Sequence, residues 1–229
     1  MALLMIAIAL AGFWPRYYGR VLTEPGLDVR SSHTLIHLHS TLFMGWLLML
    51  LGQAVLVRSG HVALHRKLGP WTAAYGFAIV PIGIWAGLVL GARRVEFGRS
   101  VEHAAGFMFV AITDMLTFAG FLTAAVVWRK SPETHKRLMV LATWSLAIVG
   151  FNRLLFKNLP MLLDYRGFTA LLMPLPALIG MLHDWKVRQR VHPVWWIGLF
   201  VFLMWANRRF FYESEAWLPV GRALLNQFR

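Results

Sequence analysis

The sequence predicts an all-α fold, a polytopic integral membrane helical bundle of about seven transmembrane helices, on three observations. Of the 229 residues, 58% are hydrophobic and 14% are charged, whereas a soluble domain has about half apolar and about a quarter charged residues. The apolar residues form long blocks separated by short basic segments, which is typical of transmembrane helices. Short segments that alternate between apolar and polar residues are missing from the sequence, which argues against an outer-membrane barrel.

The expected helices follow seven apolar segments: Ala2–Trp14, Thr34–Val57, Trp71–Leu90, Glu102–Trp128, Leu138–Phe156, Phe168–His183 and Val194–Phe211. The first would span only about 20 Å as a helix, so we expect it to continue through Pro15 or to lie shallowly. We expect Pro174 and Pro176 to kink the sixth. The second to fifth segments should form a four-helix core. Residues 1–212 then form the transmembrane domain, and residues 213–229 an amphipathic tail on the membrane surface.

The basic residues predict the partner and the orientation. A net charge of +13 would favour nucleic-acid binding in a soluble protein. Here Lys and Arg stand at segment ends, where they contact lipid headgroups, so we expect the lipid bilayer and not nucleic acid as the partner. The short loops Arg58–Gly69, Arg129–Arg137 and Asp184–His192 hold 10 of the 23 basic residues. These loops should be cytoplasmic in a bacterial inner membrane, with a cytoplasmic N-terminus and a periplasmic C-terminus.

Cofactor chemistry is restricted by composition. The chain has no cysteine, which excludes disulfides, iron–sulfur clusters, thiolate zinc sites and covalently attached c-type haem. Nine histidines and ten carboxylates remain as candidate ligands.

The second segment begins with a cluster of histidines. His37 and His39 point about 200° apart on a helix, so one helix cannot direct both, together with His33, at one metal ion. Trp46 and Gln53 follow His39 at intervals of seven residues and extend a polar stripe that should face the bundle interior. We expect His33 to be an interfacial histidine, whereas cofactor binding and packing both remain open for His37 and His39.

Two further histidines lie in the first basic loop. His61 and His65 are four residues apart, which would suit zinc if the loop were helical. No third ligand is near in sequence, and Arg66 and Lys67 would repel a cation. His65 is therefore favoured as an axial ligand or as a headgroup contact.

An ionisable residue, Asp114, lies near the middle of the fourth segment, on the face of His103. At that depth it costs at least ~2.5 kcal/mol unless it is paired or protonated. Asn152 and Arg153 stand at the same depth on the fifth segment, so we expect an Asp114–Arg153 ion pair. A structural pair is favoured, and a catalytic proton or quinone site is the alternative.

Histidines recur at two depths of the predicted bundle. His39 (or His37) and His103 lie near the outer surface, while His65 and His135 lie near the inner surface. Facing histidines on neighbouring helices can hold a b-type haem through both axial positions. The sequence therefore predicts two bis-histidine sites, His39 with His103 and His65 with His135.

A resemblance rests on the histidine-rich start of the second segment, on Trp46 and Gln53, and on the stretches His65-Arg66-Lys67-Leu68-Gly69 and His135-Lys136-Arg137-Leu138-Met139. From about Phe13 to Phe156, the chain resembles a group of small, uncharacterised bacterial multi-spanning membrane proteins. It is more distantly similar to the ascorbate-reducible two-haem cytochrome b family. That resemblance implies haem b, with His39, His65, His103 and His135 in the places of the four ligands. The chain departs from the pattern because His65 and His135 stand in basic loops and His103 adjoins Glu102.

Three functions remain open at this point. The first is transmembrane electron transfer by a haem b-binding protein, with a quinone or a redox protein as partner. The second is a membrane-embedded enzyme that acts on a lipid or isoprenoid substrate, using Asp114 and histidines. The third is an accessory subunit of a larger membrane complex, whose 11 Trp and 16 Phe residues pack against other subunits.

The orientation can be tested by labelling. Cysteines introduced at Ser59 and Ser131 should resist a membrane-impermeant thiol reagent in intact cells, because these loops are expected to be cytoplasmic. A cysteine at Ser100 should react. The reverse labelling pattern would overturn the predicted orientation.

Overall fold

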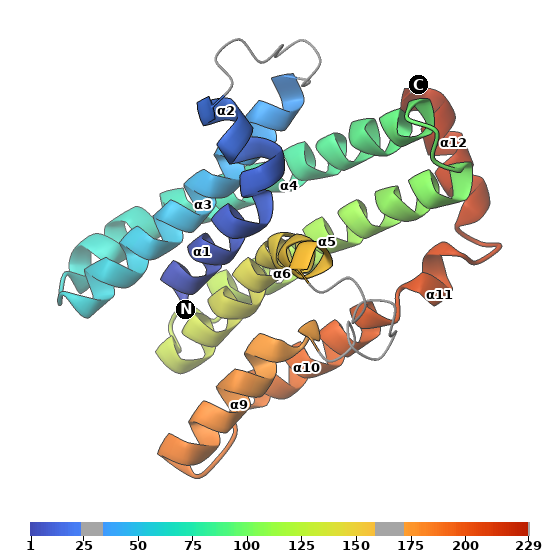
Figure 1. The fold of residues 1–229 in the computed structure, drawn as a ribbon. Helices are drawn as coiled ribbons and strands as arrows, with labels where there is room; N and C mark the ends of the chain where they lie inside the picture. The colour runs from blue at the N-terminus through green and yellow to red at the C-terminus, as the bar shows by residue number, and fades with distance from the viewer. Residues whose placement is uncertain (24–33, 159–171, 229) are drawn as a thin grey trace.

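The structure, a computed structural model, describes residues 1–23, 34–158 and 172–228, and in these ranges the chain is helical and without strands. The helices are α1 (Ala2–Phe13), η1 (Trp14–Tyr18), α2 (Gly19–Thr23), α3 (Thr34–Arg58), α4 (Val62–Glu96), α5 (Val101–Val127), α6 (Pro132–Asn158), α9 (Leu175–Arg188), α10 (Pro193–Ala206), α11 (Arg209–Tyr212) and α12 (Leu218–Phe228) (Figure 1). The predicted all-α membrane bundle is confirmed.

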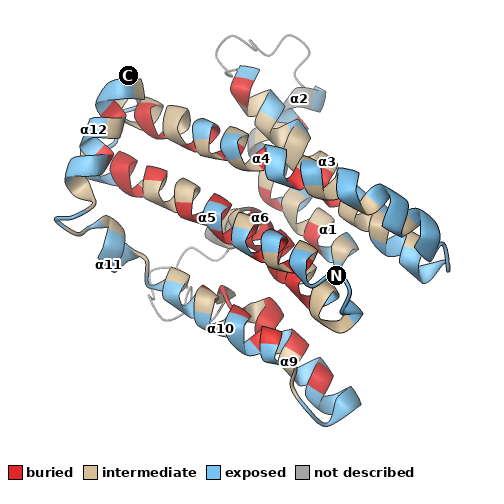
Figure 2. Ribbon diagram, turned by 180° about the vertical axis from the view of Figure 1, so that it is seen from behind, coloured by how far each residue is buried: buried red, intermediate tan, exposed pale blue. Residues whose placement is uncertain are grey.

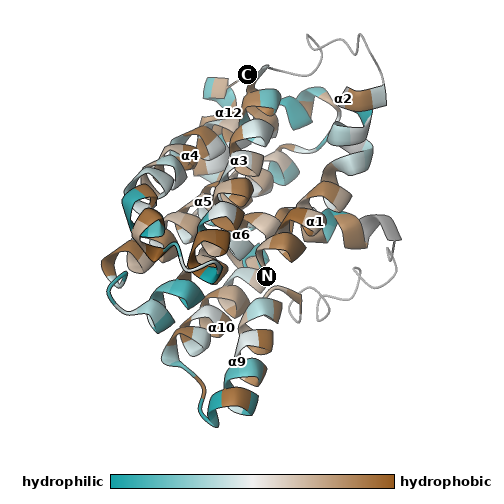
Figure 3. Cartoon of the chain, turned by 90° about the vertical axis from the view of Figure 1, so that its left-hand side faces the viewer, coloured by the Kyte–Doolittle hydropathy of each residue, from teal (hydrophilic) through white to brown (hydrophobic). Residues whose placement is uncertain are grey.

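Four helices of the described ranges, α3 to α6, are long and apolar enough to cross a membrane. The other expected spans are shorter, since α1 has 12 residues and α9 and α10 have 14 each. Hydrophobic residues run along the helices, and hydrophilic residues gather toward the helix ends (Figure 3). Large exposed residues such as Trp71 and Phe200 are stable in lipid, so the bilayer is the environment that these helices require.

Prolines behave differently at three positions. The first helix continues through Pro15 as the π-helical turn η1 and then α2, which is one of the two expected alternatives. The helix α9 begins between Pro174 and Pro176, and Pro176 lies in its first turn, where a missing N–H costs nothing; residues 168–171 of the predicted sixth segment lie outside the described residues, so the kink expected in it stays a prediction. Pro70 lies inside α4, and most of the predicted loop Arg58–Gly69 is therefore helical.

Trp46 lies at the centre of the bundle and is fully buried. Its Nε1 donates a hydrogen bond to the hydroxyl of Thr143 on α6 at 3.3 Å, and its ring meets Phe118 on α5 edge-on, with centroids 5.1 Å apart. A Cβ on Gly76 of α4 would lie 2.6 Å from the indole, so glycine is required there. This one side chain thus packs against all the other long helices.

The N-terminal helix packs against α6 at a close backbone contact. A Cβ on Gly12 would lie 2.1 Å from the carbonyl oxygen of Gly150, so both glycines allow the two backbones to approach, as small residues do between membrane helices. Buried residues line α5 and α6, while α3 and α10 present many exposed positions (Figure 2). The core therefore contains α1 in addition to the four expected helices.

The tail is an amphipathic helix, α12, that lies across the ends of α4 and α5 (Figure 1). Trp217 Nε1 donates to the carbonyl oxygen of Ala105 at 3.0 Å, and Arg222 forms an ion pair with Glu102 at 3.2 Å. Leu225 is buried against α5 and α4. The tail is thus part of the folded bundle at this end.

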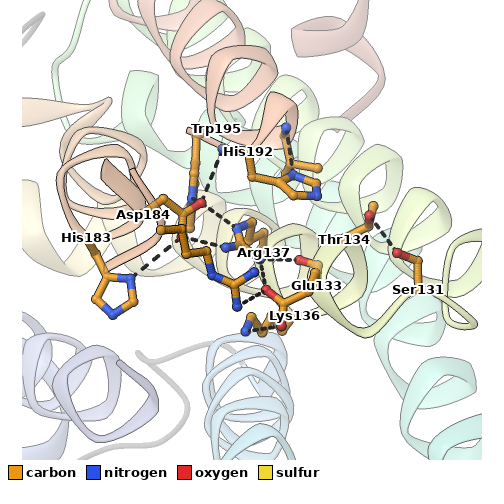
Figure 4. Close-up of polar contacts among 11 residues, drawn as sticks. Ser131, Glu133, Thr134, Lys136, Arg137, His183, Asp184, His192 and Trp195 are labelled. Carbon is orange, nitrogen blue, oxygen red and sulfur yellow. Dashed lines mark hydrogen bonds and ion pairs between the residues drawn. The ribbon is translucent and has the colours of Figure 1, made fainter. Parts of the chain in front are cut away.

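A buried charge cluster fixes the α9–α10 hairpin to α6 (Figure 4). Arg137 donates to both carboxylate oxygens of Asp184, at 3.0 and 2.5 Å, and Trp195 Nε1 donates to the same carboxylate at 3.0 Å. Arg137 also pairs with Glu133 at 2.7 Å, and Glu133 with Arg188 at 2.6 Å. Burial opposes ionisation of Asp184, but the hydrogen bonds from Arg137, from the His192 backbone and from Trp195 outweigh it and lower the pKa of this carboxyl to about 2.

We expect the free energy of unfolding to decrease as pH falls from about 4 to about 2. The pKa of Asp184 is lowered in the folded state, so its contribution is present above the unfolded pKa of about 4 and is lost as pH falls through about 2. This linkage is worth about 2.5 kcal/mol. Asp184→Asn should remove this part of the pH dependence when unfolding is measured in detergent, whereas Glu215→Gln, at an exposed position, should retain it. Equal pH dependence in wild type and Asp184→Asn would contradict the assignment.

Candidate functional site

The structure brings His65 and His135 together at the end of the bundle where α4 and α6 begin, which we call the basic end. Their ring centroids are 6.4 Å apart, and the ring planes are inclined by 70°. Each histidine is the fourth residue of its helix, since α4 begins at Val62 and α6 at Pro132. The two similar sequence stretches thus occupy matching positions, and both histidines are helical, contrary to the expected loops.

Hydrogen bonding orients one of these rings. His135 Nδ1 lies 2.8 Å from the carbonyl oxygen of Ala125, in the last turn of α5. A carbonyl only accepts, so Nδ1 carries the proton and donates, and Nε2 of the neutral imidazole keeps its lone pair. A backbone carbonyl that fixes the tautomer in this way is a common companion of a ligating histidine.

The ring of the second histidine, His65, has an unsatisfied nitrogen atom. His65 Nδ1 is buried without a hydrogen-bond partner among the described residues. Gln53 Nε2 donates to the Thr72 hydroxyl at 2.9 Å, but Gln53 Oε1 is also buried without a partner in the described ranges. Thr72 follows His65 by seven residues and so lies on the same face of α4. An unmade hydrogen bond of this kind is costly, which favours a ligand in this region.

The second expected pair is not formed. The ring of His39 packs on Phe43, with centroids 4.1 Å apart, whereas His103 is exposed and its Nε2 accepts from Arg94 at 3.2 Å. His37 is also elsewhere, with its Nδ1 2.9 Å from the Tyr17 hydroxyl. The two histidines therefore have separate partners, on α3 for His39 and on α4 for His103.

Trp46 and Gln53 have different roles from each other. Trp46 is a core residue whose indole is enclosed by protein. Gln53, seven residues nearer the basic end, is bonded to Thr72, which lies on the same face of α4 as His65. The polar stripe predicted from the sequence therefore divides into a packing position and a candidate binding position.

Asp114 forms its ion pair with Arg208 and not with Arg153. The Asp114 side chain is buried, and Arg208 reaches it from the junction of α10 and α11. Arg153 instead lies over the ring of Phe13, with its Cζ 4.4 Å from the centroid. Depth on adjacent segments does not identify Arg208 as the partner of Asp114. A positive charge inside the seventh apolar segment, Val194–Phe211, does indicate that Arg208 needs a buried partner.

No metal ion site made by side chains alone was found in the described ranges, since they hold no group of three or more His, Cys, Asp or Glu residues suitably close together. The His65–His135 pair supplies two ligands. Two protein ligands suit a metal cofactor whose remaining ligands belong to the cofactor itself.

Comparison with known proteins identifies no relative: no family description, curated protein or solved structure matches this chain.

Because Asp114 and Arg208 form a buried pair, removing one partner should be costly. We expect Asp114→Asn and Arg208→Leu each to reduce the free energy of unfolding by about 3–5 kcal/mol, since each leaves an uncompensated buried group. The double variant should recover part of this loss in a thermal unfolding assay. Arg153→Leu combined with Asp114→Asn serves as the control and should be additive. Strict additivity of the Asp114 and Arg208 variants would contradict the pairing.

Proposed function

We propose that the chain is a b-type cytochrome of the bacterial inner (cytoplasmic) membrane that binds one haem b between His65 and His135. The observation that carries this proposal is the 6.4 Å separation of the two ring centroids. Iron–nitrogen bonds of about 2 Å on both faces put the centres of two axial imidazoles about 6 Å apart. The inclination of the rings is compatible with this arrangement, because each axial imidazole can rotate about its own iron–nitrogen bond.

Other residues at the basic end fit the same group. His135 is held with Nε2 available by its bond to Ala125, while the unpartnered polar atoms of His65 and Gln53 favour an absent ligand. Arg66 follows His65 directly in sequence and would supply a cation for the carboxylates that haem carries, whereas Lys136 pairs with Glu133. The fit rests on ligands, tautomer and charge.

The chemistry proposed is electron transfer. Haem with two imidazole ligands supplies one-electron transfer, since it has no open axial position for a substrate. The protein would hold the two imidazoles in place from the starts of α4 and α6. Because His39 and His103 lie apart, we propose one haem rather than two. A quinone or a redox protein is then the partner, and it exchanges electrons at the basic end.

The alternative of a membrane enzyme that uses Asp114 has less support. Arg208 engages this carboxylate in a buried ion pair, which is the arrangement of a structural charge pair. An accessory role in a larger complex is compatible with the same fold, but no contact or site among the described residues favours it specifically.

The proposal predicts a difference spectrum. Purified protein, expressed with sufficient haem, should show reduced-minus-oxidised Soret and α bands, and pyridine haemochrome analysis should give one haem per chain. His65→Ala and His135→Ala should each abolish low-spin haem binding, because one imidazole alone leaves an axial position open.

His61→Ala and His103→Ala are matched controls and should retain the bands. His61 is exposed four residues before His65, and His103 belongs to the pair that is not formed. A featureless wild-type spectrum after haem titration, or full bands in both His65→Ala and His135→Ala, would refute haem ligation by this pair.

A further inference from the structure

A cavity lies at the basic end, between the start of α6 and the turn that joins α9 to α10, and we call it the hairpin cavity. Its volume is about 340 Å³, which is within the usual range of ligand pockets, ~300–1,000 Å³. Most of its lining residues are charged or polar: Glu133, Arg137, Asp184, Arg188, Arg190 and His192. Four of them are seen together in Figure 4. The cavity is therefore suited to a polar ligand.

The carboxylate oxygens of the hairpin cavity already have partners within the protein. Both oxygens of Asp184 accept hydrogen bonds from Arg137. Glu133 Oε1 accepts from Lys136 at 2.7 Å. Glu133 Oε2 pairs with Arg137 at 2.7 Å and with Arg188 at 2.6 Å. The two acidic side chains therefore serve to hold the arginines in place, and a ligand has to use the other groups of the cavity.

The other groups of the cavity are hydrogen-bond donors. The Arg190 guanidinium makes no hydrogen bond or ion pair with the described residues. Arg188 uses Nη2 for Glu133, and its remaining N–H groups have no partner in the described ranges. His192 Nδ1 accepts from the backbone N–H of Val194 at 3.3 Å, so the proton of the neutral ring is on Nε2, which can donate. An oxyanion that accepts several hydrogen bonds is thus the complementary ligand.

The charge of the cavity indicates how many negative charges this oxyanion carries. Three arginines and two carboxylates line the cavity, and Lys136 pairs with one of these carboxylates. The cations therefore exceed the anions by two. A phosphate monoester has about two negative charges near pH 7 and three strong acceptor oxygens, and inorganic phosphate is chemically similar. A phosphate dianion thus matches both the charge and the donors of the cavity.

We propose that the hairpin cavity binds a phosphate dianion through Arg188, Arg190 and His192 Nε2. Two sources share this chemistry, a soluble phosphate compound and the phosphomonoester headgroup of a lipid such as phosphatidic acid, and the experiment distinguishes them. The proposal is independent of haem binding. Glu133 and His135 are two residues apart on α6, so the cavity and the proposed haem ligand lie on roughly opposite faces of this helix.

The test uses the full-length chain, delipidated in a neutral detergent and kept in a phosphate-free buffer of constant ionic strength. Its thermal unfolding midpoint is measured against increasing inorganic phosphate, phosphatidic acid or phosphatidylcholine. We expect inorganic phosphate or phosphatidic acid to raise the midpoint, because a ligand that binds only the folded state stabilises it. Phosphatidylcholine should have little effect, since its phosphate is a diester and its choline group carries a positive charge.

Arg190→Gln should weaken the apparent affinity by about tenfold, since it removes a charge-assisted hydrogen bond. His192→Ser should weaken it severalfold, because a serine hydroxyl still caps α10 but provides no donor at the position of Nε2. Arg58→Gln is the matched control. Arg58 is also an exposed arginine at the basic end without a partner among the described residues, but it does not line the cavity, so this variant should leave the affinity unchanged.

Stabilisation that is weakened in Arg190→Gln and retained in Arg58→Gln supports the site. If inorganic phosphate produces it, the ligand is a soluble phosphate compound, and if only phosphatidic acid produces it, the ligand is a lipid headgroup. The proposal fails if neither ligand stabilises the wild type, or if Arg190→Gln binds as tightly as the wild type. It also fails if Arg58→Gln weakens binding as much as Arg190→Gln does, because the effect is then one of net charge alone.

Discussion

Polar groups within the hydrocarbon region must find their partners inside the protein, because lipid offers none. In this bundle several of these partnerships join two different helices. Trp46 joins α3 to α6, Gln53 joins α3 to α4, and Asp114 joins α5 to the end of α10. Apolar packing alone does not fix the order of helices in lipid, since the lipid tails are equally apolar. These bonds therefore specify which helices are neighbours.

The unsatisfied polar atoms stand out against this background. In the described residues three of the five belong to histidines at the ends of the bundle, and the others are Gln53 Oε1 and Trp205 Nε1. Trp46, in the middle of the bundle, is by contrast fully buried and donates to Thr143. The unpaired histidine atoms of the described residues therefore lie nearer the ends of the bundle, and one of these ends is where haem is proposed to bind.

Much of the fold was predictable because it depends on local composition. Apolar blocks gave the long helices, and the interval of seven residues correctly placed Trp46 and Gln53 on the inner side of α3. The pairing of His65 with His135 also followed from depth, since both histidines stand at helix starts on one side. The residue pairs that were not predictable also have a physical reason. Depth along a helix does not determine which way a side chain faces. It therefore paired His39 with His103 and Asp114 with Arg153, and the second pair is absent although α5 and α6 pack against each other. Arg137, taken as a topology-determining surface charge, is buried against Asp184, because an acidic partner 47 residues later leaves no local pattern.

The length of α4 has a consequence for the reduction potential of the haem that we propose at the basic end. Its 35 residues measure about 52 Å, which exceeds the ~30 Å hydrocarbon core by more than an ordinary tilt can absorb. One or both ends of α4 must therefore project into the headgroup layer, and His65 lies within its first two turns. A redox centre at such a position experiences the electrostatic potential of the membrane surface, about −30 mV next to anionic lipids at physiological ionic strength. Its midpoint potential would then change with lipid composition and salt, so the membrane itself would tune the direction of electron flow.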